Sequence, residues 1–127
     1  TVWLDFFTER LKSLGAEDGM AADVLAVAST NSMYNSFFKF RDLSGSEVFG
    51  GMSVGLRAHT FTNTSLDEKT VELINTAISN LNACKPCTSG HVTKSRDLGA
   101  SDDQLLEAIQ CASTMAAGCS FLKAAEA

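Results

Sequence analysis

The sequence lacks the features that mark several common classes of protein. Its 127 residues hold 10 Lys and Arg against 15 Asp and Glu, a formal net charge of −5, so the positive surface that nucleic-acid binding needs is missing. No apolar run approaches the roughly 20 residues of a membrane span, and the first residues do not have the pattern of a signal peptide. We therefore expect a cytoplasmic protein with neither a nucleic-acid nor a membrane partner.

Signals for β-structure are also scarce. No stretch of useful length alternates β-branched and polar residues, and apolar residues recur at helical spacing instead. The composition is that of an ordinary globular protein. We predict an all-α fold of about six helices in a single domain over residues 1–127. The chain starts at Thr1 rather than Met, so a truncated N-terminus is left open.

Periodicity and capping residues locate the expected helices. They are placed at about 2–14, 20–40, 66–82, 85–98 and 102–122, with a weaker short helix near 47–56, where glycines interrupt the pattern. Ser65 and Ser101 each begin a predicted capping box, and Ser44 begins a third candidate before the short helix. The helix at 66–82 carries one apolar stripe and a second stripe of polar and small residues. The dense aromatic end of the helix at 20–40, from Met33 to Phe40, is interpreted as core or as a subunit interface.

The four cysteines fall into two groups. Cys111 and Cys119 lie eight residues apart on one apolar helical face, and we interpret them as buried small hydrophobic residues. Cys84 and Cys87 form a C-x-x-C pair at the expected start of a helix, a pattern that suits a reactive dithiol in a reducing compartment.

The pair belongs to a longer motif, Cys84-x-x-Cys87-x-x-x-His91. Steps of three and four residues place the three side chains on one face of a helix. The helix N-terminus favours the thiolate form of a thiol there. Cys87 is therefore the predicted nucleophile, Cys84 the resolving thiol that condenses with a sulfenic acid, and His91 the base.

A histidine base needs an orienting partner, and Glu72 is the candidate. Glu72 lies on the polar stripe of the preceding helix, twelve residues before Cys84. If the two helices form an antiparallel hairpin, Glu72 and His91 come to about the same level. A lone glutamate at such a position would otherwise be interpreted as a solvated surface residue.

Three other interpretations of the dithiol fit the sequence less well. A structural zinc site would have Cys84, Cys87 and His91 as ligands, but no second C-x-x-C supplies a fourth. A thioredoxin-type reductase would need a βαβ pattern, which is missing. Two incidental cysteines would not explain the histidine at this spacing. His59 has no predicted partner, and we expect no metal site.

The motif resembles a known family. Glu72-x11-Cys84-x-x-Cys87-x-x-x-His91, followed by Leu98-Gly99-Ala100-Ser101 and Leu105-x-Glu107-Ala108, is similar to the alkylhydroperoxidase D family of the carboxymuconolactone decarboxylase-like superfamily. The resemblance implies an all-helical subunit of a homotrimer or homohexamer. It also implies a peroxide-reactive Cys87 that pairs with Cys84 in a disulfide, and a proton relay through His91 and Glu72. Pro86 departs from the family, whose best-studied members carry a histidine between the cysteines.

The resemblance further implies partners and chemistry. The substrate would be an organic hydroperoxide, and no cofactor would be bound. Dihydrolipoamide or a similar dithiol, carried on a lipoyl-bearing acyltransferase, would be the reductant, and a peroxiredoxin could be a further partner. The leading hypothesis is thus an antioxidant alkyl hydroperoxide reductase that cycles through a Cys84–Cys87 disulfide. The alternatives are a disulfide reductase for a peroxiredoxin or lipoyl-protein partner, a carboxymuconolactone decarboxylase-like protein of other function, and a non-catalytic helical subunit with a structural metal.

Overall fold

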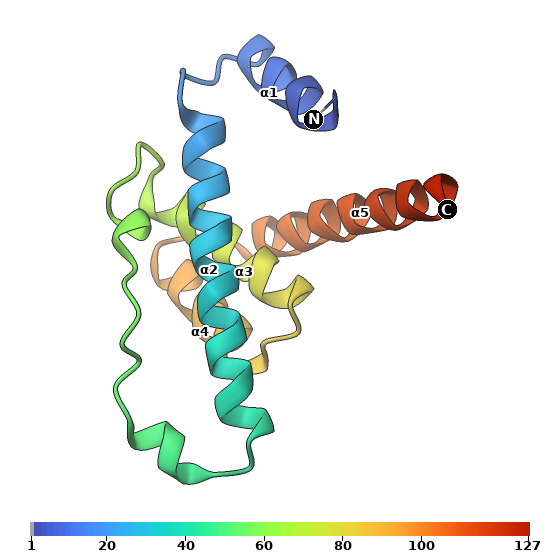
Figure 1. Ribbon diagram of the computed structural model, residues 1–127. Coiled ribbons are helices and arrows are strands. Elements are labelled where there is room, and N and C mark those ends of the chain that lie inside the picture. The colour runs from blue at the N-terminus through green and yellow to red at the C-terminus, as the bar shows by residue number, and fades with distance from the viewer. Residues whose placement is uncertain (1) are drawn as a thin grey trace.

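The computed structural model describes residues 2–127, and this part of the chain is helical without strands (Figure 1). The elements are α1 (Val2–Ser13), α2 (Met20–Leu43), η1 (Glu47–Gly51), η2 (His59–Phe61), α3 (Glu68–Leu81), α4 (Lys85–Asp97) and α5 (Asp102–Glu126), where η denotes a short 3₁₀ helix. The all-α prediction is confirmed. The described residues form five α-helices rather than about six, because the segment expected as a sixth is only a 3₁₀ turn that ends in Gly50 and Gly51.

Helix α3 lies at the centre of the fold, because α2, α4 and α5 all contact it. Helices α3 and α4 form the expected hairpin, and the chain reverses between them at Ala83, whose φ of 53° is in the left-handed region. Gly99, with a φ of 87°, ends α4 in the way that a glycine commonly ends a helix. A long extended segment returns along α2 to η2 (Figure 1).

The predicted capping boxes have different outcomes. The candidate at Ser44 is wrong, because η1 begins at Glu47 and its N-cap, Ser46, makes no side-chain capping hydrogen bond. At α5 the prediction is confirmed, because the Ser101 hydroxyl accepts from the Gln104 N–H and the Gln104 side chain accepts from the Ser101 N–H, both at 3.1 Å. At α3 it is wrong. The helix begins at Glu68, and Asp67 is its N-cap, accepting from the Thr70 N–H at 2.9 Å. A carboxylate two positions closer to the helix satisfies the free amides, and Ser65 instead donates to Asp23.

The polar stripe of α3, not its apolar stripe, is its buried face. The fully or nearly fully buried residues of this helix are Val71, Glu72, Asn75, Thr76 and Ser79. The apolar stripe is turned toward α5 and remains half-exposed. Burial of polar side chains is favourable where they are hydrogen-bonded. Helix α2 supplies partners for the Ser79 side chain, and α4 supplies them for Glu72 and Thr76. The polar atoms of the Asn75 side chain are buried without a hydrogen-bond partner.

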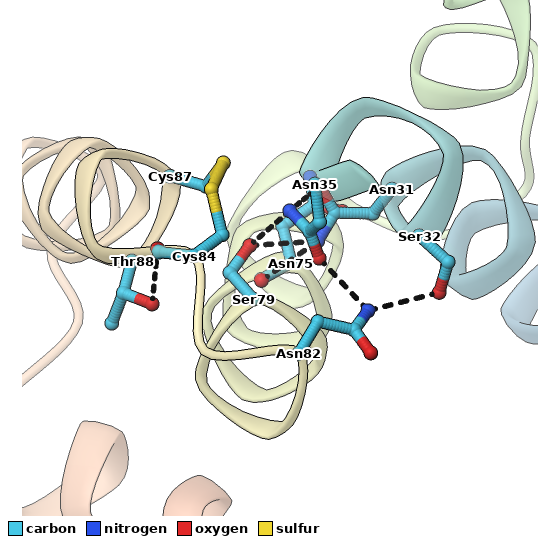
Figure 2. Close-up of a disulfide and its surroundings, with 9 residues drawn as sticks. All are labelled: Asn31, Ser32, Asn35, Asn75, Ser79, Asn82, Cys84, Cys87 and Thr88. Carbon is cyan, nitrogen blue, oxygen red and sulfur yellow. Dashed lines mark hydrogen bonds between the residues drawn. A yellow bond between two sulfur atoms is a disulfide. The ribbon is translucent and has the colours of Figure 1, made fainter. Parts of the chain in front are cut away.

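Two asparagines of α2 meet Ser79 of α3. The Asn31 side chain donates to the Ser79 hydroxyl and to the Asn75 carbonyl, both at 2.9 Å, and the Asn35 side chain donates to the same hydroxyl at 3.0 Å. Asn82, just beyond α3, donates to Asn35 at 3.0 Å. Figure 2 shows this asparagine–serine cluster beside the cysteine pair.

Helices α1 and α5 extend away from this body (Figure 1). No residue of α1 is buried, and in α5 only Leu105 is. The prediction that Cys111 and Cys119 are buried is therefore wrong for the single chain, because both are exposed. The apolar face that they share extends beyond the part of α5 that α3 can cover.

Helix α5 also differs from the expectation about membrane spans. By length and composition alone it is long and apolar enough to cross a membrane. The expectation rested on uninterrupted apolar runs, whereas α5 reaches its hydropathy with many alanines among Ser, Thr and Gln. A long helix that is apolar on most sides needs a partner to bury its apolar surface, and length and composition do not tell whether that partner is protein or lipid.

Candidate active site

The cysteine motif lies where α3 passes into α4. Cys84 is the N-cap of α4, and Pro86 follows in the first turn, where its missing N–H leaves no helical bond unmade. Cys84 and Cys87 are joined in a disulfide. Cys84 is fully buried, whereas Cys87 is partly accessible. The two sulfurs of the pair therefore differ in how easily a reagent reaches them.

The buried end of the disulfide is fixed by its surroundings. The Cys84 N–H donates to the Ser79 carbonyl at 3.0 Å, and the Cys84 carbonyl accepts from the Thr88 N–H and hydroxyl at 2.9 and 3.0 Å. Ser79 is also the residue on which the asparagines of α2 converge (Figure 2). The position of Cys84 is thus tied to both α2 and α3.

Glu72 and His91 meet across the α3–α4 hairpin. The Oε2 atom of Glu72 lies 2.6 Å from Nδ1 of His91. Glu72 is 4% exposed, so it is not the solvated surface residue of the simpler interpretation. An ionised carboxylate only accepts hydrogen bonds, so Nδ1 donates to Glu72, and in the neutral form of the ring Nε2 keeps its lone pair. The pair therefore presents a ring nitrogen that can accept a proton.

Lys94 is a member of this group that the sequence did not reveal. Its Nζ lies 3.2 Å from Oε1 of Glu72 and 3.5 Å from Oε1 of Glu68. Burial alone would raise the pKa of Glu72, but the hydrogen bond and charge of His91, followed by those of Lys94, outweigh burial and lower it. The hydrogen bond to Glu72 in turn raises the pKa of Lys94. A lysine three residues after His91 faces the same neighbouring helix, and that spacing was the available signal.

A cavity of about 240 Å³ opens onto the motif. Cys87 and His91, one turn apart on α4, both line it. The rest of the lining comes from α2, η2 and the first half of α4 and is mostly apolar: Asn31, Tyr34, Phe38, Phe61, Pro86 and Gly90. Sequence reasoning placed the aromatic residues of α2 in a core or an interface and did not foresee that three elements would converge here.

The four predicted site residues are thus brought into one region. Cys84 is bonded to Cys87, Cys87 shares the cavity with His91, and His91 contacts Glu72. Their catalytic roles remain predictions. His59 is exposed on η2 and does not line the cavity. Within residues 2–127, no group of three His, Cys, Asp or Glu side chains is arranged to hold a metal ion.

Comparison with known proteins identifies the family of this chain. Residues 49–127 match the Carboxymuconolactone decarboxylase family. A protein of Solibacter usitatus named alkyl hydroperoxide reductase AhpD is 36% identical over 90 residues, which are 71% of this chain and 51% of that protein. A protein of the same name from Frankia alni is 30% identical over 115 residues, which are 91% of this chain and 61% of the relative.

The name of a third relative assigns no activity to it. Uncharacterized protein 4 in the cox locus of Paracoccus denitrificans is 37% identical over 67 residues, 53% of this chain and 60% of that protein. The chain thus spans about half the length of the first of these curated relatives and somewhat more of the others. By the match over most of its length, the chain belongs to the carboxymuconolactone decarboxylase family, among relatives of the alkylhydroperoxidase D type.

Proposed function

We propose that this protein is a thiol-dependent peroxidase that reduces organic hydroperoxides through a Cys84–Cys87 disulfide cycle. The observation that carries the proposal is that Cys87 and His91 line one cavity while Cys84 is bonded to Cys87 from the buried side. Relatives named alkyl hydroperoxide reductase support it. An accessible thiol beside a base, with a second thiol in reach, is the arrangement that two-step peroxide reduction requires.

In the first step His91 Nε2 takes the proton of the Cys87 thiol. The thiolate attacks the terminal oxygen of the hydroperoxide, the O–O bond breaks, and the departing alkoxide takes the proton from His91. The products are an alcohol and the sulfenic acid of Cys87. Glu72 accepts the hydrogen bond from Nδ1 throughout and stabilises the imidazolium between the two proton transfers.

In the second step the Cys84 sulfur attacks the Cys87 sulfur and a disulfide forms. The hydroxyl of the sulfenic acid leaves with the Cys84 proton as water. In total two thiols supply two electrons, and the hydroperoxide becomes an alcohol and water. An external dithiol such as dihydrolipoamide then restores both thiols by exchange, first attacking the accessible Cys87 sulfur.

The test is a mass spectrum of the reduced protein after one equivalent of cumene hydroperoxide. We expect the loss of two hydrogens, located on the peptide that contains Cys84 and Cys87, with Cys111 and Cys119 still open to alkylation. Cys87→Ser should abolish this oxidation, whereas Cys84→Ser should stop at a trappable sulfenic acid. Four intact thiols in the wild type would refute the proposal.

A reductase for a disulfide partner is the second candidate, because the accessible Cys87 sulfur is open to exchange with another thiol as well as to a peroxide. Peroxide turnover that occurs only when a peroxiredoxin is added would select this candidate. The lipoyl-bearing acyltransferase belongs to either proposal as the source of dithiol.

We also propose that the protein assembles as a homotrimer or homohexamer in which copies of this chain cover α1 and α5. Apolar side chains on these helices are open in the single chain, including Trp3 at 53%, Phe6 at 58% and Phe121 at 71%. Contiguous apolar surface of this kind is uncommon on a monomer. Light scattering should give three or six times the 13.5 kDa chain mass, and a monomer or a dimer would contradict the proposal.

A further inference from the structure

The cavity beside Cys87 has a wall of three aromatic rings. Tyr34 and Phe38 are stacked neighbours on α2, with ring centroids 6.3 Å apart, and the Phe61 ring of η2 lies 6.1 Å from that of Tyr34. None of these residues is fully buried, so each ring has a side open to the cavity or to solvent.

The wall is held in place by polar contacts outside the cavity lining. The Tyr34 hydroxyl donates to the Leu56 carbonyl at 3.0 Å, which ties α2 to the extended segment before η2. Thr60, next to Phe61, donates to the Thr30 hydroxyl at 2.5 Å and fixes η2 against α2. The cavity is therefore preformed, which lowers the entropic cost of filling it.

The size of the cavity limits what it can hold. An apolar cavity of about 150 Å³ accommodates a benzene molecule, so about 240 Å³ accommodates a phenyl ring together with a short branched alkyl group. Apart from the Tyr34 hydroxyl, which donates to Leu56, the polar side chains on the lining are Asn31, His91 and the Cys87 sulfur. Both amide hydrogens of Asn31 are directed to α3, at the Asn75 carbonyl and the Ser79 hydroxyl. One polar head group beside Cys87 and one compact apolar body match this lining.

We infer, on the basis of the proposed function, that Tyr34, Phe38 and Phe61 are specificity-determining residues that select hydroperoxides with a compact aryl or tertiary-alkyl body over hydrogen peroxide. The apolar body gains free energy when it leaves water for the aromatic wall. Hydrogen peroxide has no such body and gains nothing there. Because the gain also holds the peroxide oxygen beside Cys87, it should appear in the second-order rate of thiol oxidation.

The experiment compares the rates at which cumene hydroperoxide and hydrogen peroxide oxidise the reduced full chain in a single turnover, so that no reductant is needed. The readout is the ratio of the two second-order rate constants. We expect a ratio above 10 for the wild type and a fall of about 10-fold for Phe61→Ala, the scale of discrimination by one group in an apolar pocket. Phe61→Leu should give an intermediate ratio.

Phe49→Ala is the matched control. Phe49 contacts Phe40, with ring centroids 4.9 Å apart, and does not line the cavity, so its loss should leave the ratio at the wild-type value. A wild-type ratio near 1, or equal losses with both peroxides in Phe61→Ala, would overturn the inference and leave the proposed function standing. If neither peroxide oxidised the thiols, the proposed function itself would fail, and this inference with it.

Discussion

Replacement of His91 by alanine gives the sharpest test of the proposed base. An unperturbed thiol has a pKa of about 8.5, so about 3% of it is thiolate at pH 7. If His91 acts only by removing the thiol proton, its loss can lower the peroxide rate at pH 7 by at most about 30-fold. The deficit should then shrink as the pH rises and vanish above about pH 9.5.

The proposed mechanism gives His91 a second role that the same variant can separate. In that mechanism His91 also returns the proton that the alkoxide needs, and the Glu72 contact at 2.6 Å would keep the ring oriented for both transfers. Loss of this acid would add to the deficit at pH 7, where the wild-type ring carries the proton taken from Cys87. At high pH the Cys87 proton has gone to solvent and the wild-type ring has none to give, so this part of the deficit shrinks as well. General acid–base catalysis contributes about 10²- to 10⁴-fold, so a deficit well above 30-fold at pH 7 would reveal the acid role.

The assay is stopped-flow oxidation of the reduced protein by cumene hydroperoxide between pH 6 and pH 10. His59→Ala is the matched control, because His59 is exposed and lies outside the cavity lining, and its profile should follow the wild type. If His91→Ala gave the wild-type rate at pH 7, neither role could stand, and the Glu72–His91 contact would have to be read as purely structural.

Three further predictions concern stability, measured by urea unfolding. Glu72→Gln should destabilise the protein by about 1.5–3 kcal/mol near pH 7, the scale for a hydrogen bond to a charged group. Because the folded-state pKa of Glu72 is lowered from 4.5, this difference in stability should hold above pH 4.5 and fade as the pH falls through the lowered pKa. A pH-independent difference would contradict the assignment. Ala83→Gly should stabilise by up to about 1 kcal/mol, because a left-handed φ of 53° costs alanine about 1–2 kcal/mol and glycine adds less than that in unfolded-chain entropy; a destabilised variant would show that no strain is present. Ser101→Ala should cost about 1 kcal/mol by removing the cap of α5, whereas Ser113→Ala, on an exposed face of the same helix, should change stability little.

Local rules predicted the parts of this molecule that local interactions determine. Helix periods, the glycine end of α4 and the capping box of α5 depend on residues within a few positions of one another. The Glu72–His91 contact was also within reach, because a short turn between two helices fixes their relative level. Asp67 took the place of Ser65 as N-cap because two capping residues two positions apart compete, and sequence alone does not rank them.

The features that the sequence did not predict are the buried face of α3, the exposed cysteines of α5 and the aromatic wall. All three depend on which helix packs against which face of its neighbour. Helix α3 offers an apolar and a polar stripe, and the usual rule buries the apolar one. Here the asparagines of α2 match the polar stripe, and the apolar stripe meets only part of α5. Helix packing that the sequence did not predict also leaves Cys111 and Cys119 exposed. It likewise brings the aromatic wall to the motif, because the residues of that wall come from α2 and η2, far from the motif in sequence.

The asparagine–serine cluster behind Cys84 has a consequence for how the helices find their alignment. Apolar surfaces slide past one another with little change in energy, but a shift of one turn between α2 and α3 would leave the amides of Asn31 and Asn35 without acceptors at the level of Ser79. Each unmatched buried group costs about 1–3 kcal/mol, so misaligned pairings are penalised in discrete steps. The cluster therefore fixes the register of α2 against α3. Because the Ser79 carbonyl also accepts from the Cys84 N–H, the same register sets the position of the disulfide along α3.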